Sequence, residues 1–185
     1  MPRKTGAPEA FFQEACGFAA RRHRHQVRKD GATPYVAHLM RVALTTTIVF
    51  GCADRVAVLA ALLHDTIEDT TTDYEDIEER FGADVAACVA CLTKNMALPE
   101  EERDDEYEKR LGRGPWQARL VKLADCYDNL SDAGSEAKGE EPRLPRALEH
   151  AAMALRLTKG ERGPGGLTGR ARAKLEALAR AKSGR

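Results

Sequence analysis

Apolar residues recur three or four positions apart along almost the whole chain, a spacing that places them on one face of successive α-helices. Val56, Leu59, Ala60 and Leu63 are one example. Alternation of apolar and polar residues, the pattern of a half-buried strand, is almost absent. The sequence therefore predicts an all-α protein whose helices pack around one core.

Proline, glycine and capping residues divide this pattern into segments. Thr72 and Glu75 have the spacing of a capping box, and Gly82 is a candidate helix stop. The acidic stretch 98–114 predicts a short, exposed, solvated helix between loops. The expected helices span residues 8–29, 34–51, 56–64, 72–82, 84–93, 98–114, 116–130, 142–157 and 167–182.

Length and charge restrict the classes of protein to consider. Lys+Arg and Asp+Glu both number 29, so the formal net charge is zero and no nucleic-acid partner is expected. No apolar run reaches the roughly 18 residues of a membrane span, and the first residues lack the apolar core of a secretory signal. We expect a cytoplasmic protein without a membrane partner; the pattern does not indicate an oligomeric state.

The chain divides near residue 160. Residues 1–160 are expected to form one domain, and residues 161–185 a Gly/Pro-rich linker, GERGPGG, with a short basic helix that either docks or stays loose. Basic residues on such a helix are typical of a solvated face. The five cysteines include a CxxC, Cys88 and Cys91, but its apolar surroundings favour a role in the core over metal binding.

Four ionisable residues follow the apolar run LAALL: His64, Asp65, Glu68 and Asp69. If the helix continues through them, His64 lies one turn from Glu68 and Asp65 one turn from Asp69. An imidazole next to a carboxylate suits a divalent transition metal, and the two further carboxylates could orient or deprotonate water. The alternative is that His64 stabilises a helix C-terminus and the acids form a solvated cap.

Two residues far away in the sequence support a metal site. His38 occupies a core-like position on the expected second helix, and Asp125 interrupts the apolar run LVKLAD. Removing a carboxylate from water costs several kcal/mol unless it is paired or binds a metal. Asp125 could therefore join His38, His64 and Asp65, or it could form a salt bridge with Lys122 or be exposed.

Three segments resemble, in order, the sequence boxes of one family. HRHQVRKDGATPYVAH resembles the opening box, ALLHDTIEDT the His-Asp box and VKLADCYDNL the late Asp-Asn box of the RelA/SpoT-type alarmone hydrolases, which are HD-domain phosphohydrolases. LTKNMALPEEER followed by QARLVKLAD is most similar to the compact, hydrolase-only members, including the animal stand-alone enzyme. The resemblance covers residues 8–160 and implies a single-domain HD helical bundle.

The resemblance also implies an activity and roles for individual residues. The activity is hydrolysis of the 3′-pyrophosphate of the guanine nucleotides ppGpp and pppGpp to GDP or GTP and pyrophosphate, with a divalent metal, commonly Mn²⁺. Glu68 and Asp69 match the carboxylates that handle the attacking water. The implied metal ligands are His38, His64, Asp65 and Asp125, and the implied substrate contacts are Arg28, Lys29, Asn129 and Arg143.

The chain also departs from the family pattern. Leu39 follows His38 where many relatives have a proline, and RKDGATPY is one residue longer than the usual spacing. Asp128 replaces an aromatic residue or histidine, Met96 a lysine and Ala147 a tyrosine. All three replacements are expected near the pocket and should weaken polyphosphate binding. A different phosphorylated nucleotide as substrate, or a non-catalytic nucleotide sensor, therefore remains an alternative.

Overall fold

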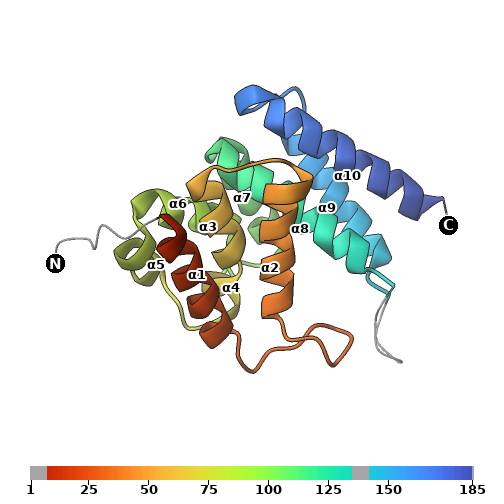
Figure 1. Ribbon diagram of the computed structural model, residues 1–185. Coiled ribbons are helices and arrows are strands. Elements are labelled where there is room, and N and C mark those ends of the chain that lie inside the picture. Colours follow the sequence, from red (N-terminus) through yellow and green to blue (C-terminus); the bar gives the residue numbers. More distant parts are fainter. Residues whose placement is uncertain (1–7, 135–141, 185) are drawn as a thin grey trace.

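The computed structural model describes residues 8–134 and 142–184, and the elements within them are helical, which confirms the predicted all-α class. Figure 1 shows α1, α5 and α6 at one end of the molecule and α9 and α10 at the other, with α2 and α3 between them. The elements are α1 (Pro8–Arg22), α2 (Val36–Leu44), the π-helical turn η1 (Thr45–Val49), α3 (Arg55–Leu63), α4 (Thr66–Asp69), α5 (Tyr74–Phe81), α6 (Ala83–Leu92), α7 (Glu100–Arg113), α8 (Trp116–Asp132), α9 (Leu144–Leu157), the 3₁₀ turn η2 (Pro164–Gly166) and α10 (Leu167–Ser183).

Helices α3 and α8 form the centre of the core. Seven consecutive residues of α3, from Ala57 to Leu63, are buried, so this helix is covered on all sides. It packs against α1, α2, α6 and α8, and α8 packs in turn against α9 and α10. Full burial of Leu59 and Leu123 stabilises this arrangement, and truncating either to alanine would cost about 2–5 kcal/mol. The backbone of both helices is therefore firmly placed.

Helix α2 begins later and ends differently from the sequence expectation. Residues 23–35 are outside regular helix, and an isolated β-bridge between Val27 and Pro34 closes the loop before α2. At its other end, α2 continues into η1, where the amide of Phe50 donates to the carbonyl of Thr45 at 2.9 Å. The expectation that α1 reaches residue 29 is wrong, because α1 ends at Arg22 and the chain turns there.

Two local expectations need correction. The N-cap of α5 is Asp73, whose carboxylate accepts from the amide of Asp76, so the expected Thr72–Glu75 capping box is misplaced by one residue. Helix α7 is not a short, exposed element, because Tyr107 and Leu111 are 2% and 1% exposed and belong to the core. These two residues lie one turn apart, and the charged residues around them hid this narrow apolar face. Gly82 does end α5, with a φ of +98° that favours glycine.

Helix α10 docks against α8 and α9, which decides between the two alternatives for the tail. Ala171 and Leu175 are fully buried in the same core as α3. The domain boundary near residue 160 stays a prediction. Cys88 is buried and Cys91 half-buried on α6, and both thiols are free. No helix of the described ranges is long and apolar enough to cross a membrane.

Candidate active site

His64 and Asp65 lie at the junction between two helices, α3 and α4. Helix α3 ends at Leu63, and α4 begins at Thr66. The two intervening residues have φ/ψ values of −58°/−31° and −98°/−1°. The sequence pattern allowed one continuous helix through His64 and Asp65, and the structure instead has two helices here. His64 is buried and Asp65 is half-buried at the junction, beside α2 and α8.

Four predicted metal-ligating residues converge at this junction. The cluster of His38, His64 and Asp65 has ligand atoms that all lie within 4.8 Å of one another. Nε2 of His64 is 3.2 Å from Oδ2 of Asp65, and Nε2 of His38 is 3.6 Å from that same atom. Oδ1 of Asp125 lies 3.3 Å from Nε2 of His38 and 3.8 Å from Nε2 of His64, although Asp125 is outside the group whose ligand atoms all lie within 4.8 Å of one another.

The opposite nitrogen of each imidazole is hydrogen-bonded, which orients Nε2 toward the cluster. Nδ1 of His64 donates to the carbonyl of Ala61 at 3.0 Å, and Nδ1 of His38 donates to the carboxylate of Asp128 at 2.7 Å. Within the described ranges, the buried Nε2 of His64 has no hydrogen-bond partner. A buried polar atom without a partner is costly unless another group, such as a metal, satisfies it.

The donor set and its spacing fit a divalent transition metal. Imidazole nitrogen and carboxylate oxygen are its common ligands in proteins. Ligand atoms that share a metal at about 2.1 Å lie roughly 3.0–3.4 Å from one another. The separations of 3.2 to 3.8 Å in this cluster are near that range. The four residues together could therefore hold one cation.

Asp125 also forms the salt bridge that the sequence offered as an alternative. Its Oδ2 accepts from Nζ of Lys122 at 2.9 Å, while its Oδ1 faces the two histidines. Burial disfavours both charges, but their mutual attraction outweighs it, holding the pKa of Asp125 well below and that of Lys122 well above the usual values. For His64, burial is likewise outweighed by Asp65 and Asp125, which raise its pKa to about 9.

Glu68 and Asp69 lie on α4, where Glu68 lines the cavity over the cluster, whereas Asp69 is exposed and is not among the residues that line it. Oε2 of Glu68 accepts from the backbone amide of Lys94 at 2.6 Å, which fixes the carboxylate at the start of the loop after α6. Burial raises the pKa of Glu68, and burial together with the charge of Asp65 raises that of Asp69. The hydroxyl of Tyr35 donates to Oδ2 of Asp65 at 2.7 Å and so ties the α2 side of the site to α4.

A cavity of about 220 Å³ opens over the cluster. His38, His64, Asp65, Glu68 and Asp125 line one part of it. Cationic side chains from the segment between α6 and α7, from α7, from α8 and from α9 also line it, together with His150: Lys94, Arg103, Lys122 and Arg146. Of these, the sequence indicated only Lys122, as a possible partner of Asp125. Arg146 and His150 lie four residues apart on α9, and that spacing was the available signal, since it places them on one helix face.

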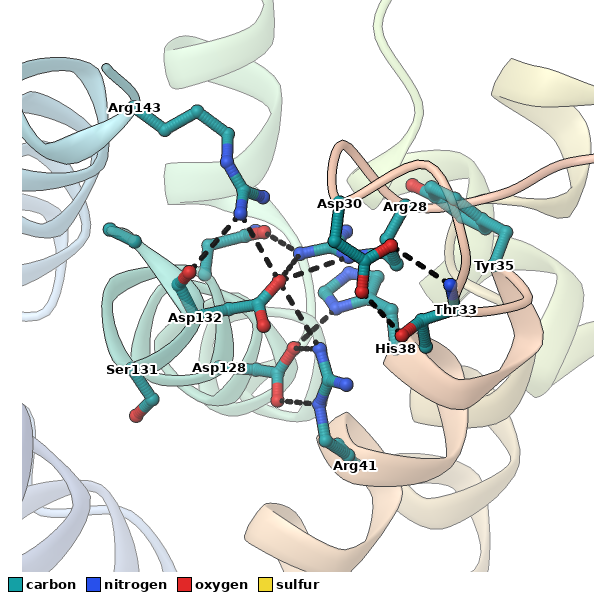
Figure 2. A network of polar contacts seen from close by, with 12 residues as sticks. Arg28, Asp30, Thr33, Tyr35, His38, Arg41, Asp128, Ser131, Asp132 and Arg143 are labelled. Atoms are coloured by element: carbon teal, nitrogen blue, oxygen red, sulfur yellow. Dashed lines mark hydrogen bonds and ion pairs between the residues drawn. The ribbon is translucent and has the colours of Figure 1, made fainter. Parts of the chain in front are cut away.

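Of the predicted substrate contacts, Arg28 and Arg143 both bind Asp132 (Figure 2), and Arg28 also binds Asn129. Nη2 of Arg28 donates to Oδ1 of Asn129 and to Oδ2 of Asp132, both at 3.0 Å. Nη2 of Arg143 donates to the Asp132 carbonyl at 3.1 Å and is 3.4 Å from its carboxylate. Lys29 is exposed on the loop before α2. Asn129 lines the cavity, whereas Arg28, Lys29 and Arg143 are not among its lining residues.

Asp128 does not add a negative charge to the cavity, contrary to the sequence expectation. It is 5% exposed, and its carboxylate accepts from His38 and from Arg41. Burial would raise its pKa, but these hydrogen bonds outweigh that effect and lower the pKa. Of the other two departures, Met96 does line the cavity, whereas Ala147 is buried on α9. The replacement at 128 therefore changes the surroundings of a histidine, not the charge of the pocket.

Residues 15–153 match the HD domain family, and the chain belongs to this family. It is 40% identical over 159 residues to the Homo sapiens protein named guanosine-3′,5′-bis(diphosphate) 3′-pyrophosphohydrolase MESH1, covering 85% of this chain and 88% of the human one. The Drosophila melanogaster protein of the same name is 40% identical over 126 residues, or 68% of this chain and 70% of the relative.

A solved structure shows the same fold. It belongs to a metazoan orthologue of SpoT, described as hydrolysing ppGpp, and superposes with a TM-score of 0.80 at 31% identity. The match covers 96% of this chain and 98% of that one. The helical arrangement that brings α2, the α3–α4 junction and α8 together is therefore shared with that protein.

Proposed function

We propose that this protein is a metal-dependent hydrolase that removes the 3′-pyrophosphate of ppGpp and pppGpp. One observation carries the proposal: two histidines and two aspartates from three separate parts of the chain lie close together in a cavity that lysine and arginine side chains also line. The relatives named above, with 40% identity over most of their length, are 3′-pyrophosphohydrolases of the same nucleotide. Cations that line the same cavity as a metal site suit a substrate with two pyrophosphate groups.

His38, His64, Asp65 and Asp125 would hold the metal, and we propose Mn²⁺. Mixed nitrogen and oxygen ligands are compatible with Mn²⁺. Such a cation, when bound, lowers the pKa of water and polarises a phosphoryl oxygen. The ionised state of Asp125, held by Lys122, keeps a negative charge available at the site.

Glu68 and Asp69 would orient the attacking water and accept its proton. The water oxygen forms a bond to the phosphorus attached to the ribose 3′-oxygen, and the bond between this phosphorus and that oxygen breaks. The 3′-oxygen takes up a proton, which leaves GDP or GTP and pyrophosphate. Glu68 suits the proton-accepting role because the Lys94 amide fixes one oxygen and its raised pKa lies closer to neutrality.

Cationic side chains would bind the phosphates. Lys94, Arg103 and Arg146 line the same cavity as the metal cluster. Arg28, Lys29 and Asn129 stay predicted contacts for the nucleoside part of the substrate, and Arg143 stays a predicted contact for phosphate. Arginine forms paired hydrogen bonds with phosphate oxygens, which favours the two cavity arginines for this role. The expected cytoplasmic location and the absence of a nucleic-acid partner also stay predictions.

Pyrophosphate release from ppGpp and pppGpp by purified protein tests the proposal. The assay compares added Mn²⁺ with a chelated sample, and wild type with Glu68→Gln. We expect turnover only in the sample that contains wild-type protein and Mn²⁺. Tight binding without turnover would instead support the nucleotide sensor, and turnover of another phosphorylated nucleotide with none of ppGpp would identify a different substrate. Turnover that persists after complete chelation would contradict the metal-dependent mechanism.

A further inference from the structure

The imidazole of His38 lies between two carboxylates from successive turns of α8. Its Nε2 is 3.3 Å from Oδ1 of Asp125, within the metal cluster, and its Nδ1 donates to Oδ2 of Asp128 at 2.7 Å. Since Asp125 and Asp128 are three residues apart on one helix, both face α2. His38 is 1% exposed, so water does not compete for these contacts.

Arg41 holds the second of these carboxylates from the same helix as His38. Its Nε donates to Oδ1 of Asp128 at 2.7 Å, and its Nη2 donates to Oδ2 at 3.0 Å (Figure 2). This paired geometry fixes the orientation of the carboxylate as well as its charge. His38 and Arg41 on α2 thus grip Asp128 from two directions. The same arginine also reaches Asp132, at 3.5 Å.

The two histidines of the cluster differ in the group that accepts the hydrogen bond from Nδ1. Nδ1 of His64 donates to the backbone carbonyl of Ala61, which only sets the ring orientation and the tautomer. Nδ1 of His38 donates to an ionised carboxylate, which does both and also makes Nε2 a stronger electron donor. Partners of this kind typically change metal affinity or activity by 10–100-fold when they are removed.

We propose that Asp128 is a positioning residue for the metal site, fixing His38 with Nε2 directed at the cation, and that Arg41 in turn orients Asp128. The inference rests on the proposed metal site but not on the identity of the substrate. It assigns a use to a carboxylate that the sequence placed in the pocket. The competing explanation is a salt bridge that only joins α2 to α8, which would affect stability and leave the metal affinity of the folded protein unchanged.

Mn²⁺ binding without nucleotide distinguishes these explanations. The dissociation constant is measured at one pH for wild type and for Asp128→Asn, which keeps the shape of the side chain and removes its charge. We expect Mn²⁺ to bind about 10–100-fold more weakly to the variant. Arg41→Gln keeps the carboxylate but loosens it, so we expect a smaller loss of affinity. Thermal unfolding of each metal-free variant shows that folded protein is being compared, and Arg41→Gln keeps the test available if Asp128→Asn fails to fold.

Glu161→Gln is the matched control. The carboxylate of Glu161 accepts from Nε of Arg119 at 2.6 Å and from its Nη2 at 3.2 Å, so it has the same paired geometry as Asp128 but does not bind His38 or Arg41 in the described contacts. We expect the control to keep the wild-type affinity for Mn²⁺. Folded Asp128→Asn with wild-type affinity, or an equal loss in both variants, would overturn the inference. Weakened Mn²⁺ binding in Asp128→Asn, together with no turnover of ppGpp by the wild-type protein, would support the inference and contradict only the proposed substrate.

Discussion

The metal side and the phosphate side of the cavity are built in different ways. The four candidate ligands are short side chains on α2, α8 and the α3–α4 junction, and the adjoining core helices fix their backbones. The cationic side consists of long side chains from α6–α7, α8 and α9, several of them partly exposed. Short side chains on buried helices have few alternative conformations, whereas long side chains have many and can reach several different partners. The first region thus depends on the fold and the second on individual residues.

The largest effect is expected from the metal side. His64→Ala removes one of the two cluster imidazoles, and no neighbouring side chain of the described site replaces its Nε2. Stoichiometric Mn²⁺ and turnover should therefore be lost together. Elemental analysis of the purified variant measures the metal, with His25→Ala, at an exposed position on the loop after α1, as the control. Full metal content in His64→Ala would place the cation elsewhere.

Glu68→Gln should separate catalysis from binding. The amide still accepts from the Lys94 backbone N–H but cannot take a proton from water. We expect turnover to fall by roughly 10²–10⁴-fold while Mn²⁺ and nucleotide affinities stay near wild type. Single-turnover kinetics and equilibrium binding measure the two quantities. A variant that loses metal instead would show that Glu68 is a ligand.

On the phosphate side, Arg146→Ala and Arg143→Ala form a pair. Arg146 lines the cavity, whereas the guanidinium of Arg143 is engaged with Asp132. Loss of one charged hydrogen bond to phosphate costs about 1.5–3 kcal/mol, so we expect KM for ppGpp to rise roughly tenfold or more for Arg146→Ala. Arg143→Ala should change KM less. The reverse order would show that the family position, Arg143, contacts phosphate and that Arg146 is only solvated.

The smallest effect concerns His150, which also lines the cavity. Burial and the charge of Lys122 lower the pKa of His150 to about 4, from the usual 6.5. Between these values the unfolded chain binds a proton that the folded chain does not, so acidification from pH 6.5 to pH 4 favours unfolding. His150→Gln removes this contribution. Its unfolding midpoint should fall less than that of wild type over this range, by roughly 2–4 °C for each kcal/mol that this protonation contributes. Parallel curves would show that His150 titrates normally.

The residues proposed for the metal side could be found in the sequence because they interrupt apolar runs, and their role as ligands stays a prediction. Asp125 interrupts LVKLAD and His38 lies at a core position, and the structure places both at the cluster. The backbone break at His64 and Asp65 was not predictable, since no glycine or proline marks it. It depends on packing of α3 against α2 and α8, which a local pattern does not contain.

The direction of a polar side chain was the weakest part of the prediction. Asp128 was expected in the pocket, but an arginine one turn after His38 provides a partner on the other side. Arg146, which lines the cavity, was not predicted, whereas Arg143, three residues earlier at the N-cap of α9, was predicted and does not line it. Both choices depend on how α2, α8 and α9 are placed relative to one another. Helix faces can be read from spacing, but the partner of a long side chain depends on tertiary structure.

Backbone hydrogen bonds join the two ends of the loop between α1 and α2. The amide of Arg28 donates to the carbonyl of Thr33, and that of Tyr35 donates to Gln26, on either side of the Val27–Pro34 bridge. These bonds set the position of Arg28 relative to α2 without involving residues 29–32. Insertions or deletions at the tip should therefore accumulate during evolution with little effect on His38. A length difference in RKDGATPY should therefore leave the position of His38 unchanged, and its effect on the chemistry should be limited to Lys29, the predicted substrate contact at the tip.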